Sequence, residues 1–86
     1  MSYKVQFTDI ARTDLKNLTS KVQERILKKV CWLVDNFEAV PHLTLTGEFS
    51  GLFKLRVGDY RVLYAADNQT KTVVIRRVGH RRDVYR

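Results

Sequence analysis

The sequence of this 86-residue chain predicts an α+β fold in which a helical hairpin covers one face of an antiparallel sheet. Segments near the N-terminus and in the C-terminal half alternate apolar and polar residues, which is the periodicity of strands. Between them, two segments carry apolar residues at helical spacing. Gly58-Asp59 separates two strand-like runs, as in a tight hairpin. The predicted order is an N-terminal strand, two helices and a three-stranded antiparallel meander, and residues 1–86 are expected to form one domain.

The first strand and the first helix follow from local patterns. A strand is predicted over residues 2–7, where every second residue from Tyr3 to Phe7 is apolar. Either Thr8 or Asp9 can then cap a helix, because both side chains accept hydrogen bonds from free backbone N–H groups. The apolar stripe expected on this helix consists of Ile10, Ala11, Leu15 and Leu18.

A second helix is predicted to begin at Ser20, because Gln23 three residues later completes a capping-box pattern. Its expected apolar face consists of Val22, Ile26, Val30, Leu33, Val34 and Phe37. Only a few residues separate the two helices, so we expect an antiparallel hairpin with one face on the sheet. Cys31, the only cysteine, is interpreted as a small core residue, and Trp32 as a packing residue. A single cysteine also leaves no disulfide framework.

The segment after the second helix, residues 38–50, is predicted to be irregular because Pro41 and Gly47 interrupt it. His42 in this segment is interpreted as a surface residue, since nothing near it supplies the spacing of a metal site. We therefore expect neither a metal nor any other cofactor.

The central prediction is a hairpin over residues 51–64 that turns at Gly58-Asp59. Its register pairs Val57 with Tyr60, Arg56 with Arg61, Leu55 with Val62 and Phe53 with Tyr64. One face is then wholly apolar, and the other carries Lys54, Arg56 and Arg61. Such opposed like charges are destabilising unless an anion lies between them, which indicates an anion-binding site. The alternative is a solvated face whose long side chains extend into water.

The last strand is predicted over residues 71–78, after a turn at residues 67–70. A four-residue loop would pair Tyr64 with Val73, Val62 with Ile75 and Arg61 with Arg76. Three arginines would then form one row across three strands, although a slip of one residue would place Arg77 there instead. After Gly79 the chain leaves the strand and ends in a basic segment.

The charge of the chain also limits its partners. Its 16 Lys and Arg residues against 9 Asp and Glu residues give a net charge of +7. This balance favours nucleic acid as a partner, then an acidic protein, then an anionic membrane surface. No apolar run approaches the roughly 18 residues of a membrane-spanning helix, and no signal peptide is recognisable. A cytoplasmic protein is therefore expected.

The motifs K-L-R at residues 54–56, Y-R-V-L-Y at 60–64 and G-H-R-R-D-V-Y at 79–85 resemble the RelE/ParE superfamily. These proteins are toxins of bacterial and archaeal toxin–antitoxin systems, and the resemblance covers the whole chain. Within the superfamily the chain looks like the RelE branch. That resemblance implies a ribosome-dependent endoribonuclease that cuts messenger RNA in the A site. The implied chemistry is metal-independent attack of a 2′-OH on the adjacent phosphate.

The resemblance also implies roles for individual residues. Lys54 matches a lysine that acts as base or charge stabiliser, and Arg61 matches the arginine that holds the scissile phosphate. Arg81 matches an arginine on the same phosphate or on the leaving group. Tyr85 matches a tyrosine that stacks on the substrate base and orients the nucleophile.

One departure from the RelE pattern leaves the proton transfers open. RelE proteins of the best-known type carry a second lysine two residues before the position of Lys54, where this chain has Leu52. His80 stands where some relatives use a histidine as acid or base, so either Lys54 or His80 can serve. The further cations expected to bind substrate are Arg56, Arg76, Arg82 and Arg86.

The resemblance implies a cognate antitoxin with an acidic or helical wrapping segment, and the ribosome and messenger RNA as further partners. Operator DNA would be contacted only through the antitoxin complex, and no membrane is involved. Two alternatives remain at this point: a ParE-like toxin that inhibits DNA gyrase without nuclease activity, and a non-catalytic basic RNA-binding module. The joint presence of Lys54, Arg61, Arg81 and Tyr85 favours the nuclease over the gyrase inhibitor.

Overall fold

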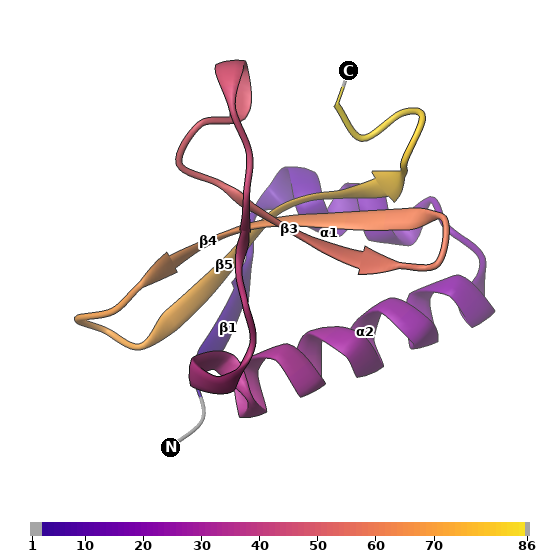
Figure 1. Cartoon of the computed structure of the whole chain (residues 1–86). Coiled ribbons are helices and arrows are strands. Elements are labelled where there is room, and N and C mark those ends of the chain that lie inside the picture. Colours follow the sequence, from indigo (N-terminus) through magenta and orange to yellow (C-terminus); the bar gives the residue numbers. More distant parts are fainter. Residues whose placement is uncertain (1–2, 86) are drawn as a thin grey trace.

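The computed structural model describes residues 3–85 and has an α+β fold, as the sequence predicts (Figure 1). Its helices are α1 (Asp9–Lys16) and α2 (Ser20–Asp35), followed by the 3-10 turns η1 (Phe37–Ala39) and η2 (Gly47–Phe49). Its strands are β1 (Lys4–Phe7), β2 (Leu43–Thr44), β3 (Phe53–Val57), β4 (Tyr60–Asp67) and β5 (Thr72–His80). The predicted start of the first strand, at residue 2, lies outside the described residues.

The described strands form one sheet in the order β1-β5-β4-β3-β2. β1 is parallel to β5, and the other neighbours are antiparallel. The sheet is therefore mixed. β2 was not predicted: the segment after Pro41 was expected to be irregular, but Leu43 and Thr44 pair with Lys54 and Phe53. Two extended residues are too few to produce a strand pattern.

Threonine side chains cap both helices. Thr8 accepts a hydrogen bond from the backbone N–H of Ala11, which confirms one of the two predicted caps. In α2 the cap is Thr19, whose hydroxyl accepts from Val22 N, and not Ser20. The Gln23 side chain turns back and donates to the carbonyl of Leu18 at 2.8 Å. The predicted capping box therefore does not form: the cap lies one residue earlier, at Thr19, and Gln23 donates to the carbonyl before it.

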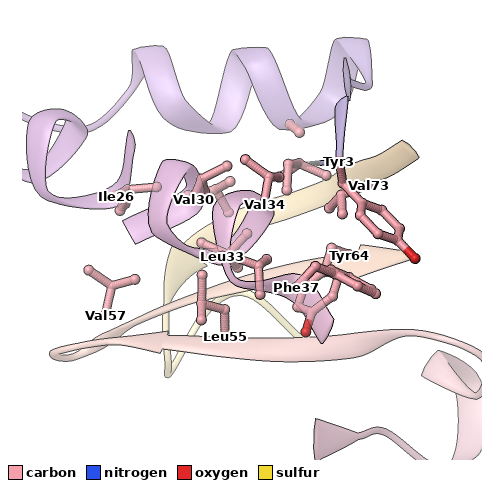
Figure 2. Close-up of a cluster of buried hydrophobic side chains, with 14 residues drawn as sticks. Tyr3, Ile26, Val30, Leu33, Val34, Phe37, Leu55, Val57, Tyr64 and Val73 are labelled. Atoms are coloured by element: carbon pink, nitrogen blue, oxygen red, sulfur yellow. The ribbon is translucent and has the colours of Figure 1, made fainter. Parts of the chain in front are cut away.

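The hydrophobic core lies between α2 and one face of the sheet (Figure 2). Ile26, Val30 and Leu33 are at most 2% exposed and pack with apolar residues of β3, β4 and β5. The predicted apolar face of α2 is therefore confirmed. On α1 only Ala11 is fully buried, whereas Ile10, expected in the stripe, is 59% exposed.

Cys31, which was expected in the core, and Trp32, which was expected to pack beside the apolar face, lie on the solvent side of α2. Cys31 is exposed, and Trp32 is 42% exposed with the Lys29 ammonium 3.8 Å from its ring centroid. The reason is helical spacing: Val30 and Leu33 face the sheet, so the two residues between them rotate away from it. Residue type alone suggested burial, but position on the helix decides it.

His42 is a structural residue and not the surface residue that was expected. Its Nε2 lies 2.8 Å from the Phe37 carbonyl and its Nδ1 lies 2.6 Å from the Tyr64 hydroxyl. A carbonyl only accepts, so in the neutral ring Nε2 donates to it and Nδ1 accepts from Tyr64. Tyr64 is 1% exposed, and burial raises its pKa to about 12. This network fastens the irregular segment to the core.

The register of β4 with β5 differs from the prediction. Asp67 belongs to β4 and pairs with Thr72, so the loop is residues 68–71. The backbone N–H groups of Thr70 and Gln69 donate to the Asp67 carboxylate, which lowers its pKa. A bulge then follows between Leu63 and Tyr64, where the partner residue changes from Arg77 to Ile75. Arg61 consequently faces Gly79 and not Arg76.

α1 lies along the edge of β5, and one carboxylate joins the two. Asp14 accepts from Arg77 Nε at 2.8 Å and from the backbone N–H of Val78 at 3.0 Å. Asp14 thereby gives the backbone N–H of Val78 a hydrogen-bond acceptor. β1 supplies none there, because it pairs with β5 only as far as Ile75. No helix among residues 3–85 is long and apolar enough to cross a bilayer.

Candidate active site

The face of the sheet opposite α2, called here the outer face, carries the cations of the central hairpin. All four predicted pairs of this hairpin are present, including Arg56 opposite Arg61. Lys54 lies opposite Leu63 on the same face and is half-buried, whereas Arg56 is exposed. The Gly58-Asp59 turn fixes this register, with Gly58 at a positive φ of 59°. The hairpin therefore presents Lys54, Arg56 and Arg61 together, as predicted.

Arg61 is held against the hairpin turn. Its Nη1 donates to the carbonyls of Gly58 and Tyr60, each at 2.9 Å, and the residue is only 9% exposed. No side-chain nitrogen or oxygen in residues 3–85 is both fully buried and without a hydrogen-bond partner. The remaining donors of the guanidinium, Nε and Nη2, therefore still reach solvent. A fixed fork with two accessible donors suits a phosphate oxygen.

The C-terminal segment folds over the outer face, on the side of the sheet away from α2 (Figure 1). The Arg81 backbone N–H donates to the carbonyl of Asp59 at 2.8 Å, which joins this segment to the hairpin turn. Val84, 1% exposed, lies over Gly79, where an added Cβ would be 3.5 Å from that of Val84. Since Gly79 pairs with Arg61, the segment is anchored beside that arginine.

Tyr85 lies at the end of this segment and remains accessible. It is 36% exposed, and its ring meets Phe49 of η2 edge-on, with centroids 5.6 Å apart. Tyr85 is thus not folded into the main core. A tyrosine ring that contacts Phe49 and still reaches solvent suits stacking on an unpaired base.

His80 occupies a different place from the hairpin cations. It pairs with Tyr60, whose ring it meets edge-on at 5.5 Å, and Tyr60 belongs to the core face. Its Nδ1 accepts from the backbone N–H of Arg82, and its carbonyl accepts from Val84. The register thus separates His80 from Lys54 and Arg61, and these hydrogen bonds make it an organiser of the C-terminal turn.

The remaining arginines do not form the predicted row across three strands. Arg76 is the extra residue of the β5 bulge and is exposed, so it does not face Arg61. Arg77 is paired with Asp14 and is not free. Arg82 is exposed, and Arg86 lies outside the described residues. The prediction of this row is wrong because a β-bulge shifts the register, and a bulge leaves no periodic signal in the sequence.

A groove of about 330 Å³ on the same side was missed by the sequence analysis. Its lining residues are Thr8, Ile10, Phe49, Leu52, Arg76 and Arg77. Phe49 lies in the segment predicted to be irregular, and Leu52 lies at the start of the predicted hairpin, so two apolar residues near this junction were the available signal. Among residues 3–85, no three His, Cys, Asp or Glu side chains gather as a metal site would require.

The structure thus combines a helical hairpin on one face of the sheet with a cationic hairpin and a basic C-terminal turn on the other. The sequence model of the ParE toxin of the type II toxin–antitoxin system parDE matches residues 5–85. The chain therefore belongs to the RelE/ParE superfamily and is a toxin of a type II toxin–antitoxin system.

Among its relatives, Toxin RelG of Mycobacterium tuberculosis is 37% identical over 86 residues, covering 100% of this chain and 99% of that protein. The toxin–antitoxin complex RelBE2 from the same organism contains a chain with 36% identity and a TM-score of 0.83. That match covers 93% of this chain and 99% of the other. A chain of the archaeal RelE–RelB complex from Pyrococcus horikoshii has 27% identity and a TM-score of 0.70, covering 98% and 100%.

Proposed function

We propose that this toxin is a ribosome-dependent endoribonuclease that cleaves messenger RNA in the A site. The observation that carries the proposal is the hydrogen bond from Arg81 N to Asp59 O, which brings the C-terminal segment onto the cationic hairpin. Two motifs some 20 residues apart in the sequence thereby share one face. That face combines guanidinium donors, an ammonium group and an accessible aromatic ring, which suit the phosphate and the base of a splayed nucleotide.

In the proposed reaction, the 2′ oxygen of one nucleotide attacks its own 3′-phosphate. A bond forms between O2′ and phosphorus as the bond from phosphorus to the 5′ oxygen of the next nucleotide breaks. The 2′ proton passes to a base, and a proton is delivered to the departing 5′ oxygen, leaving a cyclic phosphate and a 5′-OH. Arg61, whose guanidinium is held by two carbonyls, and Arg81, whose backbone is joined to the hairpin turn, stabilise the charge on the phosphate. Tyr85 stacks on a base and orients the 2′-OH.

Lys54 and His80 are the two candidates for the proton transfers, and the geometry favours Lys54. Lys54 shares the outer face with Arg61, whereas His80 shares a face with Tyr60. His80 already uses Nδ1 to accept from Arg82 N. We therefore assign proton transfer or charge stabilisation to Lys54 and a positioning role to His80. The reaction needs no metal in this scheme.

A cognate antitoxin is the natural regulator of such a surface. The solved RelBE2 and RelE–RelB relatives are toxin–antitoxin complexes. For this chain, we propose an antitoxin whose acidic segment neutralises part of the +7 charge and covers the outer face. Contact with operator DNA would then occur only through that complex.

The test is the mapping of messenger RNA 5′ ends after brief induction of the wild-type chain, Arg81→Ala and Lys21→Ala. Arg81 is exposed, so its side chain can be removed without opening the core, and Lys21 is an exposed cation of α2. Cuts in phase with codons in the wild type and in Lys21→Ala, but strongly reduced in Arg81→Ala, are expected. Growth arrest without new 5′ ends would overturn the nuclease assignment.

A ParE-like inhibitor of DNA gyrase is the second candidate, and the match to the ParE toxin sequence model favours it. Such a toxin would leave broken DNA and intact messages in the same experiment. A gyrase inhibitor would also tolerate Arg81→Ala, because binding a protein requires no arginine that holds a phosphate. The state of the chromosome and the 5′ ends, measured from one culture, separate the two functions.

A further inference from the structure

The outer-face groove is bounded by α1, by the bulge of β5 and by the segment that enters β3. Three apolar side chains contribute to it: Ile10, 59% exposed, and the half-buried Phe49 and Leu52. An exposed isoleucine next to a phenylalanine and a leucine forms an apolar surface patch. Such patches mark binding sites. A volume of about 330 Å³ is at the lower end of small-ligand sites, and is large enough for a planar ring.

The charge of the groove comes from one arginine. Arg77 also lines it, but the Asp14 carboxylate neutralises that guanidinium at 2.8 Å. Arg76 makes no ion pair with any residue between 3 and 85, and the bulge turns it out of the strand ladder. The groove therefore offers one aromatic ring, that of Phe49, and one unneutralised guanidinium. Aromatic rings and arginine planes are the two surfaces on which bases stack in single-stranded nucleic acid.

The groove is also continuous with the candidate active site. Phe49 lines the groove and meets the Tyr85 ring at a centroid distance of 5.6 Å. Leu52 lines it too, and stands two residues before Lys54 on the same face of the same chain segment. A nucleotide strand whose one base lies on Tyr85 would thus have its neighbouring base beside Phe49.

We propose that this groove is a subsite for the messenger RNA base that neighbours the base stacked on Tyr85. The inference rests on the proposed nuclease function and deepens it. Ile10, Phe49 and Leu52 enclose the base, and Arg76 either covers its face or holds the adjoining phosphate. A base in this groove fixes the backbone on both sides of the cleaved phosphate, and so makes cleavage depend on the identity of a second nucleotide.

The first experiment compares cut-site sequences and cleavage rates on programmed ribosomes for the wild type, Ile10→Asp and Leu27→Asp. Ile10 and Leu27 are both exposed helical residues, at 59% and 40%, but only Ile10 lines the groove. The Ile10→Asp variant should no longer hold the base in the groove, so we expect it to cleave about tenfold more slowly than the wild type, or slower still. The preference at one nucleotide flanking the cut should also relax, and Leu27→Asp should match the wild type.

A second measurement reads the base directly. An uncleavable messenger carries 2-aminopurine on either side of the scissile phosphate, and its fluorescence falls when the base is stacked. Quenching at one position by the wild type, lost in Ile10→Asp and reduced in Arg76→Ala, supports the subsite. Unchanged quenching and an unchanged cut pattern in Ile10→Asp would overturn it.

The outcomes distinguish this inference from the function on which it rests. A wild-type chain that cuts no RNA removes the nuclease function and the subsite with it. A wild type that cuts, with an Ile10→Asp variant that cuts at the same sites and rate, removes only the subsite. If that variant keeps its cut pattern but loses antitoxin affinity, the groove holds an apolar side chain of the antitoxin, which also overturns the proposal.

Discussion

Replacement of Asp14 by alanine is expected to destabilise the chain far more than replacement of Asp9 on the same helix. The Asp14 side chain is 18% exposed and accepts from Arg77 Nε at 2.8 Å and from Val78 N at 3.0 Å. Its loss leaves a half-buried guanidinium and a backbone N–H without their acceptor. Hydrogen bonds to charged groups contribute about 1.5–3 kcal/mol. Since Arg77 is 34% exposed and water can reach it, we expect a loss of about 2 kcal/mol.

Asp9 provides the matched control, because its side chain is fully exposed and its ion pair with Arg12 spans 3.9 Å. A surface ion pair this exposed contributes little to stability. Urea unfolding measures both variants. With a slope of about 1 kcal/mol per M for a small domain, Asp14→Ala should lower the midpoint by about 2 M. Equal midpoints for the two variants would refute the conclusion that Asp14 fastens α1 to the sheet.

Two further predictions concern the core and the hairpin turn. Burial raises the pKa of Tyr64 to about 12 from the ordinary value of 10, so its contribution to stability is fully present below pH 10 and is lost as the pH rises toward 12. The wild type should therefore lose up to about 3 kcal/mol more than Tyr64→Phe in urea unfolding between those pH values, and parallel losses would contradict this assignment. Gly58 has a φ of 59°, and an added Cβ would lie 2.6 Å from the flexible end of Arg25. Gly58→Ala should cost about 1 kcal/mol and lower Tm by about 4–8 °C, and an unchanged Tm would contradict the strained-turn assignment.

The parts of the fold that were predicted correctly are those whose signals are local. The central hairpin register follows from one turn dipeptide and the alternation around it, and every predicted pair agrees with the structure. The buried side of α2 follows from helical spacing. The β4–β5 register failed because it depends on which residue begins the loop. Asp67 caps that loop from within the strand, and a bulge then shifts the ladder again.

The site was predictable only where it lies on the hairpin. Lys54, Arg56 and Arg61 share a face because strand residues alternate. No pattern could show that the C-terminal segment returns to the hairpin turn, because that requires the hydrogen bond from Arg81 N to Asp59 O. The groove beside it is likewise a tertiary feature, since Ile10 and Leu52 are 42 positions apart in the sequence. Family resemblance supplied residue roles there, and those roles remain predictions.

The placement of Arg61 reduces the repulsion between the two opposed arginines of the hairpin. Facing Arg56 directly, it would add repulsion to a strand pair that must remain stable. Its Nη1 instead donates to the carbonyls of Gly58 and Tyr60, whose partial negative charge offsets part of that repulsion. The same contacts limit the usefulness of Arg61→Ala as a probe of catalysis, because this variant also removes a turn-stabilising group. Arg61→Lys keeps the charge but lacks the fork, so lost cleavage with a normal Tm would assign the fork to the phosphate.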